Sequence, residues 1–321
     1  MSYSALIVGL GQIGMGYDYD LASSDFITSH AKAVQMHPDF ELVGGVDPLD
    51  NQRDRFSKKY GKPAYKSLPV ALKECSFDLA IVSTPTKEHV ETVKQLLEAK
   101  GVRLILCEKP LANKLADAKD MLDLAKRENT TVAVNYTRRY DPGILGVLKR
   151  LKSGELGFPI KACVWYGKGI FNNGSHFLNL LSTLMGETQR IKIISKGRLW
   201  DGWDPEPDVK IIFEKGEAYF LAVKEENFSY SQIEFIGPKG KVNYGKGNRI
   251  NWWVTESDPL FPGYTILQKK ADKIPIDLNR YQYHVLQNLS EFLRGRNELL
   301  CDGNSGFETM QILNDIQKEL V

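Results

Sequence analysis

The chain has 321 residues, enough for two domains with sizeable cores. Its 42 basic and 40 acidic residues give a net charge of +2, which favours neither a nucleic-acid nor an anionic membrane partner. The cysteines are far apart in sequence and do not have the spacing of a metal site: Cys75, Cys107, Cys163 and Cys301. From this spacing we expect no metal. No run approaches the roughly 20 apolar residues of a membrane span, so we expect a cytoplasmic protein.

The N-terminal stretch predicts a strand followed by a phosphate-binding turn. Residues 5–8 are apolar and partly β-branched, as in a buried parallel strand. The pattern Gly9-x-Gly11-x-x-Gly14 follows directly, and it permits a tight turn, close approach of a pyrophosphate and close packing of a helix. The phosphates would then lie at the N-terminal amides of that helix. A glycine turn without a ligand is the alternative.

Residues 17–29 form a polar and partly aromatic insertion before a helical stretch near residues 30–36. An insertion of this length without periodicity is typically functional or disordered. Our hypothesis is that it covers the cofactor or substrate through Tyr17, Tyr19 or Phe26, and the alternative is a solvated loop. It also explains why Asp47 lies 33 residues after Gly14, against roughly 20 in the usual dinucleotide-binding unit.

The strand predicted at residues 41–46 ends at Asp47-Pro48. An acidic side chain at this place can accept both hydroxyls of the adenosine ribose, which favours NAD over NADP. A plain Asp-Pro turn is the alternative interpretation, and Arg53 leaves NADP possible.

The rest of the first half alternates helices and strands. Helices are predicted at residues 51–60, 68–74, 88–100 and 114–128, and strands at 77–82, 102–107 and 131–135. Repeated units of this kind form a doubly wound parallel sheet, whose ligands bind beyond the carboxyl ends of the strands. The strand ends here carry the glycine turn, Asp47, Thr84-Pro85, Lys109 and Arg138-Arg139.

The second half predicts a different architecture. Short strands are expected at residues 160–166, 189–196, 209–213, 218–223, 232–236 and 241–244, with turns at Gly216, 237–240 and 245–247. Helices are expected at 175–185, 281–294 and 307–320, the last two packing back on the domains.

We therefore predict an α/β Rossmann domain over residues 1–135 and an α+β domain with an open, mostly antiparallel sheet over 136–321. The outer face of this sheet is expected to form a homodimer or homotetramer.

Over nearly its whole length the chain resembles the Gfo/Idh/MocA oxidoreductase family, through several motifs that occur in the family's order. They are the glycine turn, Asp47-Pro48, Ser83-Thr84-Pro85 with His89, Glu108-Lys109-Pro110, Arg138-Arg139-Tyr140-Asp141-Pro142 and Gly174-Ser175-His176. The resemblance implies a Rossmann domain, a second domain with an open sheet, and NAD(P)-dependent oxidation or reduction of a sugar or polyol. It also implies that Lys109 and His176 are the catalytic pair.

On this basis we expect two sets of contacts. The cofactor is expected at Gly9, Gly11, Gln12, Ile13, Gly14, Asp47, Ser83, Thr84, Pro85, His89, Glu108 and Lys109. The carbohydrate substrate is expected at Arg138, Arg139, Tyr166, Asn172, Asn173 and Asn179.

The chemistry of the pair can be argued without the family. Oxidation of a secondary alcohol removes a hydroxyl proton while hydride leaves the same carbon, and a neutral His176 can accept that proton. Lys109 can stabilise the developing alkoxide. The interpretation of His30, His37 and His284 is structural, with a substrate-edge role left open for His284, and His89 is expected to cap a helix or touch the cofactor.

One departure from the family pattern bears on the substrate. Asn172 and Asn179 occupy positions where many family members have Asp, and an amide cannot accept a proton. We therefore expect a sugar nucleotide or modified sugar rather than an inositol. A catalytically weak regulatory or scaffold protein that binds NAD(P), and an enzyme that retains NAD and performs net non-redox glycoside cleavage, remain open.

Overall fold

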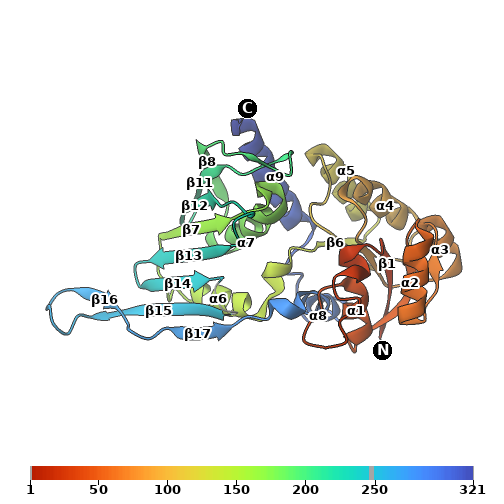
Figure 1. Ribbon diagram of the computed structural model, residues 1–321, viewed down its shortest axis with the longest axis horizontal. Helices are drawn as coiled ribbons and strands as arrows, with labels where there is room; N and C mark the ends of the chain where they lie inside the picture. Colours follow the sequence, from red (N-terminus) through yellow and green to blue (C-terminus); the bar gives the residue numbers. More distant parts are fainter. Residues whose placement is uncertain (1, 246–248, 321) are drawn as a thin grey trace. The chain divides into compact units, whose positions relative to one another are not determined.

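A computed structural model describes residues 2–245 and 249–320 (Figure 1). The chain divides into two compact units. The first unit contains residues 2–140 and Asn279–Glu308, and the second contains Asp141–Leu278 and the segment from Thr309 onward. This division differs from the expected boundary after residue 135, because the helix α8 (Tyr281–Leu293) packs against α1 (His30–Met36) and η2 (Thr137–Tyr140) of the first unit.

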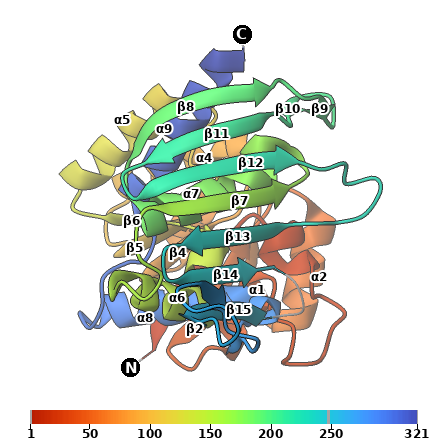
Figure 2. The same cartoon turned by 90° about the vertical axis from the view of Figure 1, so that its left-hand side faces the viewer.

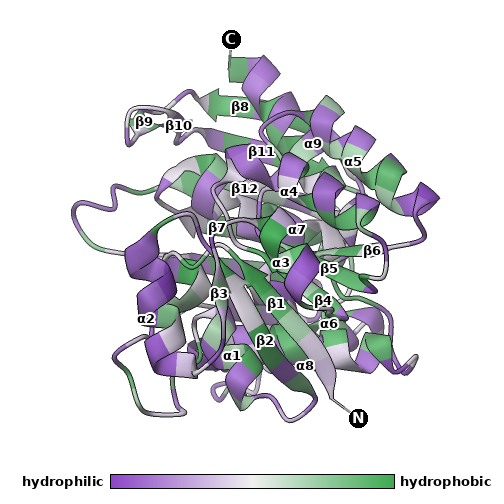
Figure 3. Ribbon diagram, turned by 90° about the vertical axis from the view of Figure 1, so that its right-hand side faces the viewer, coloured by the Kyte–Doolittle hydropathy of each residue, from purple (hydrophilic) through white to green (hydrophobic). Residues whose placement is uncertain are grey.

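The first unit is organised around a parallel sheet in the order β3-β2-β1-β4-β5-β6. Its strands are β1 (Tyr3–Val8), β2 (Phe40–Val46), β3 (Ala64–Tyr65), β4 (Leu79–Val82), β5 (Leu104–Cys107) and β6 (Thr131–Val134). Every residue of β4 and β5 is buried, as expected for strands covered on both faces, and Figure 3 shows the hydrophobic colouring along β1. The predicted Rossmann sheet is confirmed.

Helices follow the strands of this sheet in the expected alternation. They are α1 (His30–Met36), α2 (Asp50–Tyr60), α3 (Leu68–Glu74), α4 (Thr86–Glu98), α5 (Leu115–Arg127) and α8, with the short turns η1 (Gln12–Gly16) and η2 (Thr137–Tyr140). In α4 the buried residues His89, Val93, Leu96 and Leu97 recur at helical spacing, which places one stripe of the helix in the core.

The second unit is organised around a mixed sheet in the order β16-β15-β14-β13-β7-β12-β11-β8 (Figure 2), with β17 paired to β15 (Figure 1). Its strands are β7 (Ile160–Tyr166), β8 (Thr188–Ser195), β11 (Asp208–Phe213), β12 (Gly216–Ala222), β13 (Gln232–Gly237), β14 (Gly240–Tyr244), β15 (Arg249–Ser257), β16 (Thr265–Leu267) and β17 (Asp272–Pro275). Only β7 and β12 pair in parallel among the described strands of this sheet, so the expected mostly antiparallel sheet is confirmed.

The remaining elements of the second unit surround a buried core. They are α6 (Pro142–Lys152), η3 (Gly169–Gly174), α7 (Ser175–Met185) and the two-strand pair β9 (Leu199–Trp200) and β10 (Asp204–Pro205). The turn η4 (Leu278–Arg280) and the helix α9 (Gly303–Leu320) lie where the chain passes from one unit to the other. Tyr166, Phe177 and Phe220 belong to the core, which buries one face of the sheet.

One helix and several strands of this unit, among them β9 and β10, were absent from the sequence prediction. Helix α6 begins after Asp141, whose carboxylate accepts the backbone N–H groups of Gly143 at 2.8 Å and Ile144 at 3.2 Å. Asp before Pro is the ordinary signal of a helix start, so this helix was predictable. The strands β15–β17 were also missed, and the turn predicted at 245–247 lies partly outside the described residues.

Candidate functional site

The three glycine positions of the first turn require glycine for different physical reasons. Gly9 has a φ of +101°, and a Cβ there would lie 2.6 Å from the backbone of Ser83. A Cβ on Gly14 would lie 2.1 Å from the Gly9 carbonyl oxygen. A Cβ on Gly11 would meet nothing within 4 Å, so packing within the protein does not require this glycine. Close approach of the protein backbone to a bound pyrophosphate, as in dinucleotide binding, would require it.

The helix predicted to follow the glycines is only the five-residue turn η1, so the expected helix N-terminus is wrong in its extent. Gln12 and Ile13 lie in η1, where the N–H groups of Gly16 and Tyr17 bond to carbonyls five residues back. This wide winding is a π turn, which ordinarily remains short. The regular helix α1 starts at His30, after the insertion.

The insertion at residues 17–29 is folded around a buried carboxylate, whereas a solvated loop was the alternative to a ligand cover. Asp18 is fully buried and accepts the N–H groups of Thr28 at 2.7 Å and Ser29 at 3.0 Å. Helix α8 holds the same end, because the Tyr281 hydroxyl donates to the Thr28 carbonyl at 2.8 Å. The two ends of the insertion are therefore bonded to each other, and its C-terminal end is also bonded to α8.

Only part of the hypothesis that the insertion covers a ligand remains. The Tyr19 ring lies beneath the cationic groups of Arg55 and Lys59, at 4.3 and 4.4 Å, so this residue is engaged by α2. Tyr17 and Phe26 are exposed, and a covering role for them stays a prediction.

Asp47 lies at the carboxyl end of β2, where the ribose-binding residue was expected. It is buried, and its carboxylate accepts the N–H groups of Leu10 and Leu49, each at 2.9 Å. Each carboxylate oxygen has a second lone pair, so two acceptor positions remain for hydroxyl groups. Arg53 donates to the carbonyls of Asp47 and Pro48 and pairs with Asp50, so it is already engaged within its own turn.

The predicted Ser83-Thr84-Pro85 segment joins the glycine turn to α4. The Ser83 hydroxyl donates to the carbonyls of Val8 at 3.2 Å and Gly9 at 2.8 Å. The Thr84 hydroxyl oxygen is buried and, among the described residues, has no hydrogen-bond partner. Pro85 is the N-cap residue of α4. The orphaned hydroxyl and the open side of Gly11 both fit a ligand bound along this rim.

His89 is buried within the first unit, which leaves almost no surface for its expected cofactor contact. It is 1% exposed, and its ring nitrogens lie 2.9 Å from the carbonyl oxygens of Pro110 and Thr84. The residue therefore bridges two strand ends rather than touching the cofactor itself.

The Glu108 carboxylate is held by side chains from two neighbouring segments. Its carboxylate lies 2.8 Å from His30 Nε2 and accepts a hydrogen bond of 2.6 Å from the Asn135 amide, which also donates to Gln282 of α8. Burial alone would raise the pKa of Glu108, but the bonds from His30 and Asn135 and the charge of Lys109 outweigh it, so the pKa lies below its usual value. Sequence reasoning missed this role of His30.

Lys109 directly follows Glu108 beyond the end of β5. Arg138 and Arg139 lie in η2 after β6, and Arg139 donates to the Cys301 sulfur at 3.7 Å. Lys109, Glu108 and both arginines are thus on the strand-end rim of the first unit, where the topology predicted them.

The second unit places His176 in the first turn of α7, immediately after η3. The fully buried Asp204 carboxylate of β10 accepts the N–H groups of Phe171 at 3.0 Å and Asn172 at 2.8 Å. Glu206 accepts the N–H of Gly169 at 3.3 Å and pairs with Arg198. These contacts fix the turn before His176, and the sequence offered no signal for them.

Gly169 is required by this arrangement. Its φ is +77°, and a Cβ there would lie 2.0 Å from the Asp204 carboxylate.

The predicted substrate residues of the second unit have different outcomes. Asn173 donates to the Gly167 carbonyl at 3.1 Å. Asn179 is buried and donates to Thr309 at 2.9 Å. Tyr166 is fully buried, and its hydroxyl donates to the Pro207 carbonyl at 2.6 Å, so its predicted substrate contact is wrong. Burial and the nearby carboxylates of Glu206, Asp208 and Asp204 raise the pKa of Tyr166.

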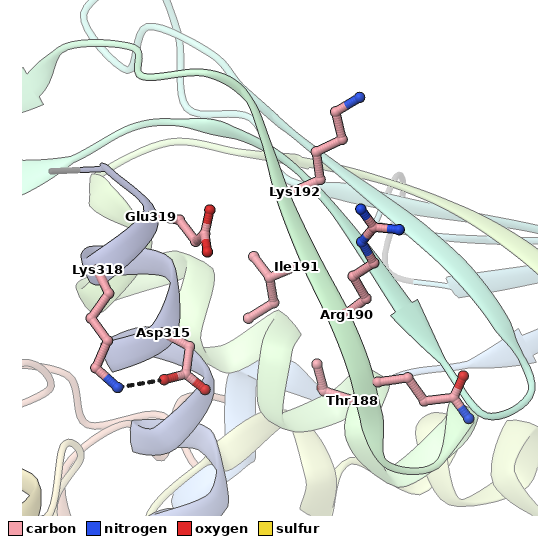
Figure 4. A pocket seen from close by; sticks show the side chains of 8 residues that line it. Thr188, Arg190, Ile191, Lys192, Asp315, Lys318 and Glu319 are labelled. Carbon is pink, nitrogen blue, oxygen red and sulfur yellow. Dashed lines mark hydrogen bonds and ion pairs between the residues drawn. The ribbon is translucent and has the colours of Figure 1, made fainter.

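A cavity of about 540 Å³ lies between β8 and the end of α9 (Figure 4). It is lined by Thr188, Gln189, Arg190, Ile191, Lys192, Asp315, Lys318 and Glu319, none of which is a predicted site residue. Charged side chains on an edge strand ordinarily prevent pairing with another chain, which explains this surface without a ligand.

The described residues contain no cluster of three or more side chains suited to a metal ion. None of the helices among them has the length and apolar character of a membrane span.

Known proteins resemble the chain in its first part most clearly. Residues 4–136 match the GFO_IDH_MocA family model, "Oxidoreductase family, NAD-binding Rossmann fold". The scyllo-inositol 2-dehydrogenase (NAD(+)) of Bacillus subtilis strain 168 is 26% identical over 48% of this chain, which spans only 41% of that protein. The inositol 2-dehydrogenase of Rhizobium meliloti strain 1021 is 25% identical over 74% of this chain and 76% of its own length.

A solved structure extends the likeness of fold to the whole chain. The WlbA dehydrogenase from Bordetella pertussis, in complex with NADH and UDP-GlcNAcA, has a TM-score of 0.78 and 19% identity, covering 100% of this chain and 97% of its own. The predicted family resemblance is confirmed. Residues 4–136 thus resemble the NAD-binding Rossmann domain of the Gfo/Idh/MocA family of oxidoreductases.

Proposed function

We propose that the protein transfers hydride between NAD and a secondary alcohol or ketone of a sugar, sugar nucleotide or polyol. The observation that carries this proposal is the glycine turn, in which Gly11 alone has no packing reason to be glycine. Because that turn lies on the same strand-end rim as Lys109, a dinucleotide bound there would extend toward a candidate catalytic side chain.

The residues of the rim fit a nicotinamide dinucleotide. The turn from Gly9 to Gly14 would hold the pyrophosphate, Asp47 the adenosine ribose, and Thr84 the opposite end through its orphaned hydroxyl. When bound, the nicotinamide supplies the hydride acceptor or donor.

The proton is handled by this chain's own groups in the proposed reaction. His176 accepts the hydroxyl proton as the alcohol is oxidised, and Lys109 stabilises the developing negative charge on the oxygen. Asn172 adds no carboxylate to this step, although the turn that carries it is fixed by the carboxylate of Asp204. Proton transfer therefore depends on His176 and Lys109 alone.

The substrate class is argued from relatives. Two curated relatives are named as inositol dehydrogenases, and the WlbA structure contains a UDP-sugar acid. Asn172 in place of an aspartate favours the sugar-nucleotide class over inositol, whereas Asn179 is buried and bonded to Thr309. For the assembly, we propose a homodimer or homotetramer through the outer face of the second sheet.

A substrate screen tests the proposal. Sugar nucleotides, free sugars and polyols are incubated with the protein and NAD, and both reduced nicotinamide and sugar product are measured. Reduced nicotinamide formed in step with product supports the proposal. Product without net reduced nicotinamide indicates the retained-cofactor reaction, and NAD binding without product indicates a regulatory or scaffold protein.

A further inference from the structure

Two buried histidines lie at opposite ends of the tripeptide that carries Lys109. His30, the first residue of α1, bonds the Glu108 carboxylate at 2.8 Å, and it is 1% exposed. Its bond to Glu108 is backed by Asn135, which donates to the same carboxylate oxygen at 2.6 Å. The backbone N–H of Glu108 is also fixed, because it donates to the Val82 carbonyl of β4 at 2.9 Å.

His89 holds the other end. Its Nδ1 lies 2.9 Å from the Pro110 carbonyl oxygen, and its Nε2 lies 2.9 Å from the Thr84 carbonyl oxygen. The ring therefore connects the end of β5 to the end of β4, and it sits in the first turn of α4. At 1% exposure it has no surface for a ligand, so any effect on a reaction must pass through Thr84 or Pro110.

We propose that His30 and His89 are positioning residues that clamp the segment Glu108-Lys109-Pro110 from both ends and thereby aim the Lys109 side chain. The proposal rests on the catalytic role of Lys109 proposed above. Each histidine acts on a neighbour of Lys109 rather than on the substrate. Small displacements of a catalytic group cost large factors in rate, so a fixed tripeptide is a functional requirement as well as a structural one.

Hydrogen bonds of the insertion at residues 17–29 stabilise this clamp. Ser29, which precedes His30, donates its N–H to the buried Asp18 at 3.0 Å. Gln282 of α8 accepts from Asn135 at 3.2 Å, and its own backbone N–H donates to Ile27 at 3.4 Å. The insertion and α8 therefore hold in place His30 and Asn135, the two side chains that bond the Glu108 carboxylate. This gives the insertion a role besides that of a cover.

The test compares three kinds of substitution in the full-length protein with NAD present. His30→Leu and His89→Leu remove the donors, whereas His30→Gln and His89→Gln retain an amide donor of similar reach. His37→Leu is the matched control, because His37 is also buried and hydrogen-bonded in the first unit, but its partners are Gln287 and Asp39.

Two readouts are taken for each variant. Backbone hydrogen exchange at residues 108–111 reports the segment without any substrate, and steady-state kinetics report turnover and cofactor affinity. Each Leu variant should exchange faster at this segment and lose about 10- to 100-fold in turnover. For His30→Leu the NAD affinity should change by less than about threefold, whereas His89→Leu also releases Thr84, a proposed cofactor contact, and so weakens NAD binding as well. The Gln variants should recover most of the turnover, and the double Leu variant should lose less than the product of the single losses, since both changes release one segment.

The clamp is overturned if the Leu variants match His37→Leu in both readouts, or if the Leu and Gln variants lose turnover equally. Should a Leu variant fail to fold, the shorter His30→Asn and His89→Asn replace it, and equal behaviour of Asn and Gln overturns the clamp. A failure of the catalytic role proposed for Lys109 is recognised separately. In that case Lys109→Ala would keep the turnover of the wild type, whatever hydrogen exchange at residues 108–111 shows.

Discussion

The segment that carries Lys109 and the turn that precedes His176 are held by opposite kinds of hydrogen bond. In the first unit the segment supplies acceptors, the Glu108 carboxylate and the Pro110 carbonyl, and histidine and asparagine side chains approach them. In the second unit the turn supplies backbone donors, and buried carboxylates of Asp204 and Glu206 accept them. An amide side chain can replace a histidine donor, but it supplies only one of the two acceptor oxygens of a carboxylate. Substitution by an amide should therefore be tolerated better at the histidines of the first region than at the carboxylates of the second.

The largest loss of turnover is expected when the proposed reacting side chain of either region is removed. Lys109→Ala and His176→Ala should each lower turnover by about 10²–10⁴-fold, because each removes a group that acts in the transition state. Equilibrium titration should show a much smaller change in NAD affinity. Turnover within a few-fold of wild type in either variant would return that residue to a structural role.

A smaller effect is expected at the anchor of the second region. Asp204→Asn keeps the shape of the side chain but turns an N–H donor toward a backbone N–H, which costs about 1–3 kcal/mol, or roughly tenfold to a hundredfold. We expect this loss in turnover, with NAD affinity unchanged. Asp208→Asn is the control, since Asp208 accepts the N–H of Ala222 on β12 rather than that of the turn. Equal losses in the two variants would show a general loss of packing.

The cofactor preference sharpens the account of the first region. Asp47 should accept the ribose hydroxyls and repel a 2′-phosphate, so NAD should bind about tenfold to a hundredfold more tightly than NADP. Titration of both cofactors measures the ratio, and Asp47→Asn should narrow it. NADP binding equal to NAD would mean that Arg53 exchanges its present partners for the phosphate.

The smallest effect is a pH dependence of stability. Because the pKa of Glu108 is lowered in the folded protein, its contribution to stability is complete above the ordinary pKa of 4.5 and is lost as the pH falls through the lower folded value. Glu108→Gln should therefore flatten the loss of unfolding free energy below pH 4.5, measured by denaturant titration at several pH values. Parallel curves for variant and wild type would contradict the direction of this shift.

Much of the first unit was predictable from the sequence, because its signals are local. Apolar runs gave the strands, helical spacing gave the helices, and Gly9, Asp47 and Lys109 fell at the strand ends that the topology brings to one rim. The helix α6 had an Asp-Pro start and could have been found.

The contacts that hold the site could not be read in the same way. His30 meets Glu108 across 78 positions, and Asp204 meets Asn172 across 32. Nothing local distinguishes such a residue from a solvated one: Asp18 lies in a polar insertion yet is fully buried. A polar side chain that serves a distant backbone group leaves no periodic signal, so only tertiary structure reveals it.

Direct hydride transfer is the measurement that tests the central proposal most directly. The protein is incubated with NAD and the substrate found by the screen, carrying deuterium on the alcohol carbon, and the nicotinamide is examined by NMR. The account predicts deuterium on the nicotinamide ring in step with ketone formation, much faster for wild type than for Lys109→Ala. Product formed while the nicotinamide stays free of deuterium would contradict it.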